Sequence, residues 1–421
     1  MRSIFLKFVV LGAVVALFAA QAPIAFESKA RIVASGRDPM IAVRASGALS
    51  LMKVENSDVW LQTSFDGGDG FEPSVRINDV AGEVSSHAES SPQLYVRTMH
   101  EFYCLWQTRR PGQQQHEGSA LRFSRSMDWG QSFSKAIDVE GASGAASQSF
   151  FTMNVSPNGI VYAAWLDGRD RTSGRQGTAA VYLAKSVNRG ASFEPSVRVA
   201  LDACPCCRPS IGFTGSDTVQ VAWRKVLDDN VRDIFVAASN DGGATWSAGT
   251  RVAEDNWTLN GCPHSGAAMA SLGKRLFISW YTVREKQAKL YLAFSDDAGK
   301  TFSKRYDLSG ATVDPNHPYM LRTDDKISIL FQGRDPNESQ GWGAVNTYYR
   351  ELDAQGGLSP VQRLAHAAGS ASYPHLAFEA PGRLYTVWME PQNNGTAIVM
   401  TRGRRAGAAA AGTAREVSHA R

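Results

Sequence analysis

The sequence predicts an all-β protein built as a β-propeller, in which small four-stranded sheets, called blades, repeat around a central axis. Three observations predict this fold. A turn motif recurs five times, short strand-like runs surround each copy, and a tryptophan recurs at the end of the second run. The copies start 53 to 62 residues apart. Self-similarity at a nearly fixed spacing indicates a repeat architecture, and this spacing suits one blade per repeat.

The recurring turn motif has the form Ser-x-Asp-x-Gly-x-x-aromatic, with Asn replacing Asp in one copy. Ser and Asp side chains can bond nearby backbone N–H groups, and glycine accepts the positive φ that a tight turn needs. The aromatic residue is expected to fill the space beneath the turn. The motif therefore predicts a structural turn rather than a catalytic group. Its copies occupy residues 64–71, 126–133, 186–193, 239–246 and 295–302.

Four short runs of β-branched and aromatic residues accompany each motif, separated by polar turns. In the fourth unit they are Pro209–Phe213, Val219–Trp223, Ile234–Ala238 and Thr250–Val252. Runs of this length and composition are typical of the strands of four-stranded blades. The tryptophans that end the second runs are Trp106, Trp165, Trp223, Trp280 and Trp388.

Counting the first strands favours seven blades, with six as the alternative. The sixth unit has Asp353–Gly357 in place of the motif, and the seventh shows only three strands. The missing strand has a candidate near the N-terminus, Ala30–Ala34. We expect it to pair with Ala397–Thr401, closing the ring and removing two exposed sheet edges. The first strands start near Pro39, Pro92, Phe150, Pro209, Ser265, Pro318 and Pro374.

The turn motif resembles the Asp-box, or BNR repeat, of sialidases and related propellers, and the resemblance covers most of the mature chain. It implies a glycoside hydrolase of the exo-α-sialidase type as an alternative function. Sialidases use three arginines, a tyrosine activated by a glutamate, and an aspartate as acid/base. Arg37-Asp38-Pro39 resembles the Arg-Ile-Pro sequence of the first sialidase blade, with its middle residue changed. Tyr348, Tyr349 and Glu351 do not align with the family nucleophile, so we expect hydrolysis to be absent or marginal.

Both ends of the chain differ in composition from the part between them. Arg2 and Lys7 precede an apolar run, Phe8–Ala20, which small residues follow. This order predicts a signal peptide over residues 1–25, and the run is too short to span a bilayer comfortably. We assign residues 26–402 to the propeller and residues 403–421 to a disordered, basic, Ala/Gly-rich tail. The mature protein is expected in the periplasm or outside the cell, without a membrane span.

The charge distribution excludes one class of partner. The formal net charge is +4, but the leader contributes +2 and the tail +3, so the folded part carries about −1. Such a body lacks the positive field that nucleic-acid binding requires. The expected partners are a metal ion, a small anionic or glycan ligand, or another exported protein.

Four of the five cysteines lie in two links between units. Cys204, Cys206 and Cys207 precede the fourth unit, and Cys262 precedes the fifth together with His264. The links stand about one repeat apart, so they should be neighbours on one face of the ring. The remaining cysteine, Cys104, lies in a strand-like run and is expected to be buried.

Three interpretations of the clustered cysteines stay open: a metal site, a redox-active pair, and two disulfides, which would make the protein an adhesion or assembly scaffold with stapled loops. The metal site is favoured, since a disulfide staple has no use for the imidazole beside Cys262. Sulfur and imidazole ligands suit Cu(I) or Zn(II). His87 and His317 occupy comparable links and could contribute. The predicted metal ligands are Cys204, Cys206, Cys207, Cys262 and His264.

Arginines are frequent in the turns between second and third strands, on the same face as the cysteine links. Several guanidinium groups on one face could bind carboxylate or phosphate through paired hydrogen bonds. The alternative is a solvated rim of Arg–Asp pairs, because Asp167, Asp170 and Asp335 lie in the same turns. The predicted ligand-binding residues are Arg37, Arg109, Arg169, Arg224, Arg284 and Arg334.

Overall fold

The computed structural model describes residues 23–109, 118–140, 147–171, 173–338, 343–364 and 369–406. Regular structure in these ranges consists of strands and two 3-10 turns, η1 (Ala88–Ser90) and η2 (Asp228–Asn230). The all-β prediction is therefore confirmed. The described chain contains no helix that could serve as a membrane span. Most of the predicted signal peptide (residues 1–22) and of the tail (residues 407–421) lies outside the described residues.

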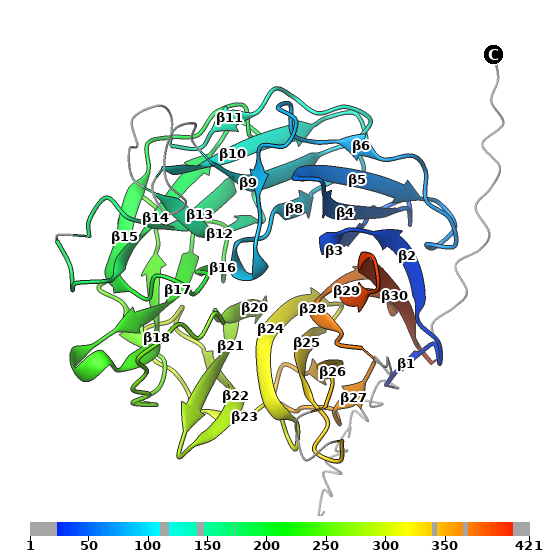
Figure 1. Cartoon of the computed structure of the whole chain (residues 1–421). Coiled ribbons are helices and arrows are strands. Elements are labelled where there is room, and N and C mark those ends of the chain that lie inside the picture. The colour runs from blue at the N-terminus through cyan, green and yellow to red at the C-terminus, as the bar shows by residue number, and fades with distance from the viewer. Residues whose placement is uncertain are drawn as a thin grey trace, which may run out of the picture.

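The strands form six antiparallel sheets that follow one another in chain order around a central axis (Figure 1). The first contains β3 (Arg37–Val43), β4 (Leu49–Glu55), β5 (Asp58–Ser64) and β6 (Val75–Arg76). The second contains β7 (Val84–Ser85), β8 (Gln93–Val96), β9 (Phe102–Arg109), β10 (Ser119–Ser126) and β11 (Ile137–Asp138).

The third sheet has eight strands and carries the first cysteine link. Its first four are β12 (Gln148–Val155), β13 (Val161–Asp167), β14 (Ala179–Ser186) and β15 (Val197–Ala203). The others are β16 (Ser210–Phe213), β17 (Val219–Val226), β18 (Arg232–Ser239) and β19 (Thr250–Arg251). A single pair, Ala203 with Lys225, joins the two groups, and it lies directly before Cys204.

Three sheets complete the ring. One contains β20 (Ala268–Leu272), β21 (Arg275–Arg284), β22 (Gln287–Ser295) and β23 (Tyr306–Asp307). The next contains β24 (Val313–Thr323), β25 (Lys326–Arg334), β26 (Asn346–Leu352) and β27 (Gln362–Arg363). The last contains β28 (Ser372–Glu379), β29 (Arg383–Gln392), β30 (Gly395–Arg405), β1 (Ile24–Phe26) and β2 (Arg31–Ser35).

The two ends of the described chain meet in this last sheet. Strand β2 pairs with β30, with Arg31 opposite Met400 and Ser35 opposite Ala397, so the predicted pairing is confirmed (Figure 1). Strand β1 continues the contact by pairing with residues 403–405. The sequence predicted a tail over residues 403–421, but strand β30 extends to Arg405, so the predicted start of the tail is three residues too early. Residues 403–405 pair with β1, and residues 403 and 404 also pair with β29. Their Gly/Arg composition gives no sign of this pairing.

Much of the core lies between neighbouring sheets, where side chains of one sheet pack against the next, and another part lies within the eight-stranded sheet. The five recurring tryptophans are fully buried in it. A buried indole N–H needs a hydrogen-bond partner. Four of the five donate to a carboxylate, at distances of 2.6 to 3.2 Å. The exception is Trp223, whose Nε1 has no partner among the described residues and which packs in the same cluster as three cysteines.

The five turn motifs share one hydrogen-bond pattern. In each, the serine hydroxyl donates to the Asp or Asn side chain and accepts the N–H of the glycine four residues on. These glycines have φ between 75° and 93°, which L side chains rarely adopt. The motif is thus a self-contained turn, as the sequence predicted.

Candidate functional site

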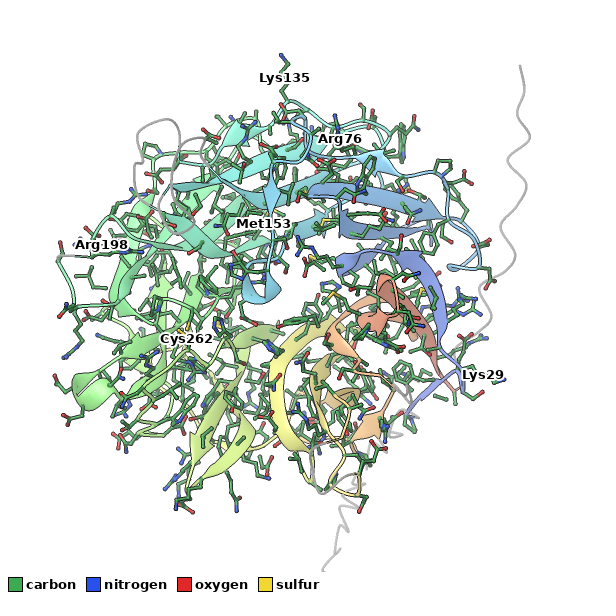
Figure 2. The ribbon with its side chains drawn as sticks, viewed as in Figure 1. Lys29, Arg76, Lys135, Met153, Arg198 and Cys262 are labelled. Atoms are coloured by element: carbon green, nitrogen blue, oxygen red, sulfur yellow. The ribbon has the colours of Figure 1, made fainter. Side chains whose placement is uncertain are left out.

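The two cysteine links converge on one point of the molecule, as expected. The sulfur atoms of Cys204, Cys206 and Cys207 lie within 4.8 Å of one another. A second group, formed by Cys206, Cys262 and His264, meets the same limit. Cys206 belongs to both groups. We call the first the buried triad and the second the exposed triad; Figure 2 marks Cys262 in the latter.

Backbone contacts hold the first link in place. The N–H of Cys204 donates to the carbonyl of Arg224 over 2.8 Å, which extends the pairing of β15 with β17. The three cysteine side chains of this link are at most 4% exposed. The second link carries Cys262 and His264 at the surface, and His264 has a φ of 47°. One triad is therefore enclosed, and the other opens to solvent.

Two arginines favour negative charge on the buried sulfurs. The Nη1 atom of Arg232 lies 3.1 Å from the sulfur of Cys204. The sulfur atoms of Cys204 and Cys206 lie 3.6 Å apart. The pKa of Cys204 is strongly lowered by hydrogen bonds from the thiols of Cys206 and Cys207, with Arg232 and Arg224 adding favourable charge. The pKa of Cys206 is raised by the hydrogen bond that Cys206 makes to Cys204, and the pKa of Cys207 is raised by burial. Such an environment favours a single thiolate at Cys204 when the site is empty.

Arg224 connects the two links and is only 1% exposed. Its guanidinium donates to the backbone carbonyls of Arg232, Ser265 and Tyr281, over 2.7 to 3.3 Å. It also lies over the ring of Trp257, at 5.3 Å from its centroid. Arg224, which the sequence predicted to bind a ligand, is thus a buried cation that holds together the backbone segments around the cysteine cluster.

The histidines of the other links lie outside both triads. The ring of His87 packs edge-on against Phe150, at 5.2 Å, and His264 packs against the same phenylalanine at 6.3 Å. Burial lowers the pKa of His87, and the charge of His264 adds to this effect. His317 instead places its Nδ1 2.5 Å from a carboxylate oxygen of Glu89.

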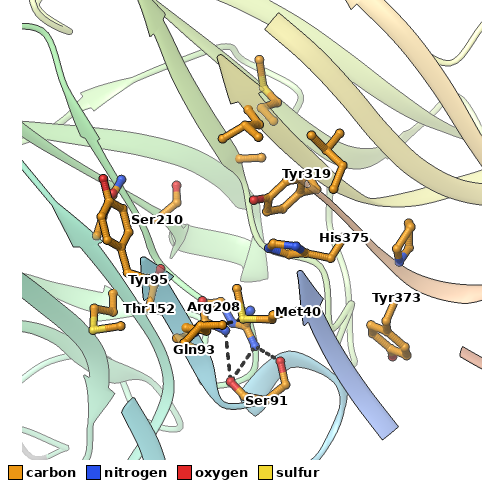
Figure 3. A pocket seen from close by; sticks show the side chains of 18 of the residues that line it. Met40, Ser91, Gln93, Tyr95, Thr152, Arg208, Ser210, Tyr319, Tyr373 and His375 are labelled. Atoms are coloured by element: carbon orange, nitrogen blue, oxygen red, sulfur yellow. Dashed lines mark hydrogen bonds between the residues drawn. The ribbon is translucent and has the colours of Figure 1, made fainter. Parts of the chain in front are cut away.

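A cavity of about 500 Å³ lies at the centre of the ring, and Figure 3 shows it from close by. It is lined by strands β3, β8, β12, β16, β20, β24 and β28. Arg208 follows Cys207 and reaches into this cavity, where it donates to the carbonyl of Glu89 and the hydroxyl of Ser91. The first cysteine link therefore also forms part of the cavity wall.

Several titratable groups in the cavity have perturbed pKa values. Burial raises the pKa of Asp38 and, helped by the nearby charge of Glu89, raises that of Tyr373 to about 12. Burial would also raise the pKa of Glu89, but the charge and hydrogen bond of His317 outweigh it and lower that pKa. His375 has a pKa lowered to about 3 by burial, and its buried Nε2 has no partner within the described residues.

The remaining predicted arginines do not converge. None of those whose side chains are described lines the cavity. Arg37 is half exposed beside Asp38, Arg284 lies next to Glu285, and Arg334 pairs with Asp314 at 2.9 Å. Arg169 pairs with Asp167 and Glu140 and stacks on Tyr182. The side chain of Arg109 lies outside the described part of the chain.

The other tyrosines and cysteine considered from sequence are core residues. Tyr349 is buried and shares a hydrogen bond of 2.9 Å with Ser328, while Glu351 pairs with Arg405. Cys104 is fully buried, with its sulfur 3.7 Å from that of Met52, so its predicted burial is confirmed.

Sequence reasoning missed four groups that shape the site. They come from different strands and loops, and no local spacing connects them. Arg208 offered the one available signal, since it directly follows the cysteine motif. The missed residues are Glu89, Arg208, Arg232 and Tyr373.

Comparisons with solved structures support the fold. A protein of unknown function from Dyadobacter fermentans DSM 18053 is 15% identical over 77% of this chain and 97% of its own, with a TM-score of 0.54. A PL25 polysaccharide lyase, an ulvan lyase bound to -[GlcA(1-4)Rha3S]-, is 10% identical over 88% of this chain and 95% of its own, with a TM-score of 0.55. At such identities the likeness concerns the fold alone.

A sialidase is also similar: NanB from Streptococcus pneumoniae is 10% identical over 85% of this chain and 84% of its own, with a TM-score of 0.49. No match exists among curated proteins. The BNR repeat-like domain matches residues 52–386, which include all five turn motifs. This match spans well over half of the sequence, and the chain therefore belongs to the family of BNR repeat-like domain proteins.

Proposed function

We propose that this chain is an exported, seven-bladed β-propeller that binds a soft metal ion, Cu(I) or Zn(II), through the cysteine and histidine residues of two neighbouring links. The observation that carries the proposal is the convergence of five ligand atoms from these links into two triads sharing Cys206. The blade count is supported by the seven strands that line one central cavity.

The spacing of the sulfur and nitrogen atoms suits coordination. Thiolate–metal bonds are about 2.3 Å long, so two ligands of one ion lie at most about 4.6 Å apart. The atoms of each triad already lie within 4.8 Å of one another. Binding would therefore need only small side-chain movements. Thiolate with imidazole is the ligand combination that soft and borderline metals prefer.

The electrostatics also favour a cation. A thiol must lose its proton to bind a metal, and this cost makes affinity depend on pH. The lowered pKa of Cys204 favours its thiolate form before the ion arrives. Arg232 and Arg224 then offset the negative charge that a second and third thiolate add. A disulfide staple would give no role to the imidazole of His264, which lies in the exposed triad.

The test is a Cu(I) titration of the reduced, mature chain against a chromophoric chelator, without oxygen. We expect Cys262→Ser to weaken binding at the exposed triad by about tenfold or more, and His264→Ala to weaken it there measurably. Cys104→Ala is the matched control, because it removes a cysteine that is buried inside a sheet. Failure to bind stoichiometric Cu(I) or Zn(II), or an equal loss in the control variant, would contradict the proposal.

One observation favours glycan binding or hydrolysis as a second function. Tyr373, Glu89 and Asp38 line the same cavity, and the charges of Glu89 and Asp38 both act on the tyrosine. Glycosidases of several kinds use such a carboxylate set. The fold is also similar to that of an ulvan lyase bound to a sugar. Turnover of a fluorogenic sialoside that Tyr373→Phe abolishes would establish hydrolysis, and we expect turnover to be absent or marginal.

A further inference from the structure

We infer that the cluster holds two Cu(I) ions with the thiolate of Cys206 as the bridge between them, one ion in the buried triad and one in the exposed triad. This inference rests on the proposed metal-binding function and specifies its stoichiometry and its route of loading. Figure 2 marks Cys262, the cysteine through which the exposed triad opens to solvent.

Distances within the cluster argue against one ion shared by all five ligands. Ligands of a single ion lie at most about 4.6 Å apart when its bonds are about 2.3 Å long. The five atoms instead fall into two groups of three, each within 4.8 Å. Within the described residues, no larger group of Cys, His, Asp or Glu meets that limit. One ion can therefore occupy either triad after small side-chain movements, whereas contact with all five atoms would need larger ones.

The shared residue indicates how two ions would coexist. Cys206 contributes its sulfur to both triads and lies 3.6 Å from Cys204. A thiolate sulfur has several lone pairs, so it can bind one ion on each side. No other residue of the cluster is common to both groups. Replacing Cys206 should therefore damage both sites, whereas replacing any other ligand should damage one.

The charges around the cluster favour Cu(I) over Zn(II) at this stoichiometry. Two Cu(I) ions bound by four thiolates and a neutral imidazole leave two negative charges. The guanidinium of Arg232 lies 3.1 Å from Cys204, and that of Arg224 acts on Cys204 and Cys207, which balances these two charges. Two Zn(II) ions would instead neutralise the four thiolates by themselves and leave the two guanidinium charges unbalanced in a largely enclosed site, which is costly.

The difference in burial predicts the order of loading. Cys204 and Cys207 are each 1% exposed, whereas Cys262 and His264 lie at the surface. An arriving ion would first meet Cys262, His264 and Cys206. It would then exchange Cys262 and His264 for Cys204 and Cys207 while it remains bound to Cys206. Copper stays in the Cu(I) state throughout. Cys206 and Cys262 each release a proton to solvent when the ion first binds. On transfer, Cys204 and Cys207 bind as thiolates and release any proton they carry, and Cys262 takes up a proton until a second ion arrives.

The experiment combines native mass spectrometry of the Cu(I)-loaded chain with X-ray absorption and with removal of copper by a chelator. We expect two Cu(I) ions per chain, a copper–copper scattering contribution, and two release phases whose rates differ at least tenfold. The double variant Cys262→Ser/His264→Ala should keep one slowly released ion. Cys204→Ser/Cys207→Ser should keep one rapidly released ion, and Cys206→Ser should keep neither tightly.

Cys104→Ala serves as the cysteine control, and thermal unfolding of each copper-free variant identifies any that fail to fold. The wild-type stoichiometry and scattering remain decisive in that case. One ion per chain, or two ions without copper–copper scattering, would overturn the bridged pair and leave the proposed metal function standing. No bound copper or zinc would overturn both.

Discussion

The five turn motifs lie within the repeats and the two cysteine links lie between them, and these two kinds of loop are stabilised in different ways. Each turn motif is held by hydrogen bonds within itself, as in Ser239, whose hydroxyl bonds to Asp241 and to the N–H of Gly243. The cysteine links depend on residues far away in the sequence. Arg232 reaches Cys204 from 28 positions along the chain, and Arg224 reaches Ser265 across 41.

This difference separates the scaffold from the function. A contact that recurs in several repeats is explained by the folding of each repeat. A contact found at one position only is explained by the residues around that position. Trp223 illustrates the point, since four equivalent tryptophans donate to a carboxylate and it does not. It packs beside Cys204, Cys206 and Cys207, so the repeat departs from its pattern where the candidate metal ligands lie.

If the cysteine links depend on distant residues, the largest loss of stability is expected when Arg224 is replaced. The Arg224→Met change keeps most of the side-chain volume but leaves three backbone carbonyls without their charged donor. Breaking a buried, charged network of this kind lowers the free energy of unfolding by about 3 kcal/mol or more. Urea unfolding of the metal-free protein measures this loss, and the Cu(I) titration should show weaker binding as well.

Arg334→Met provides the matched control for this change. Arg334 pairs with an acidic residue, Asp314, rather than with buried carbonyls, and both side chains are partly exposed. Ion pairs of that type contribute about 1 kcal/mol or less. Similar losses for Arg224→Met and Arg334→Met would show that Arg224 is one more rim arginine, and the distinction drawn between the two regions would be lost.

A smaller effect is expected at a turn motif. The Ser239→Ala change leaves the N–H of Gly243 without its acceptor, which should lower the free energy of unfolding by about 1 to 2 kcal/mol. Cu(I) affinity should stay unchanged, because the lost hydrogen bond lies within the turn and involves no residue of the cysteine cluster. Ser216→Ala, at an exposed serine, should change stability by less than about 0.5 kcal/mol. A loss of copper binding in Ser239→Ala would show that turns and links are coupled.

Much of the fold could be predicted from sequence because its signals are local and repeated. The serine, aspartate and glycine of each turn lie within five residues, so the sequence displays the whole hydrogen-bonded unit. The pairing of residues 31–35 with residues 397–400 followed from counting strands and from the cost of an open edge. Convergence of the cysteine links followed from their spacing of about one repeat.

The rest of the site could not be predicted because its contacts join distant segments. Nothing local pairs Glu89 with His317 or brings Arg232 to Cys204. For the arginines, the sequence suggested a shared site that the structure does not assemble. Their frequency indicated a binding face, but the structure pairs Arg169 and Arg334 with acidic neighbours and buries Arg224. Which of these roles an arginine takes depends on the tertiary neighbours that the sequence does not display.

Metal analysis together with a free-thiol count, on protein isolated from its native compartment without added metal or oxidant, tests the central claim most directly. The account predicts bound copper or zinc, and four cluster thiols plus Cys104 that react once the metal is removed under denaturing conditions. The contrary result would be a metal-free chain in which Cys104 alone reacts and Cys204, Cys206, Cys207 and Cys262 are all oxidised to disulfides.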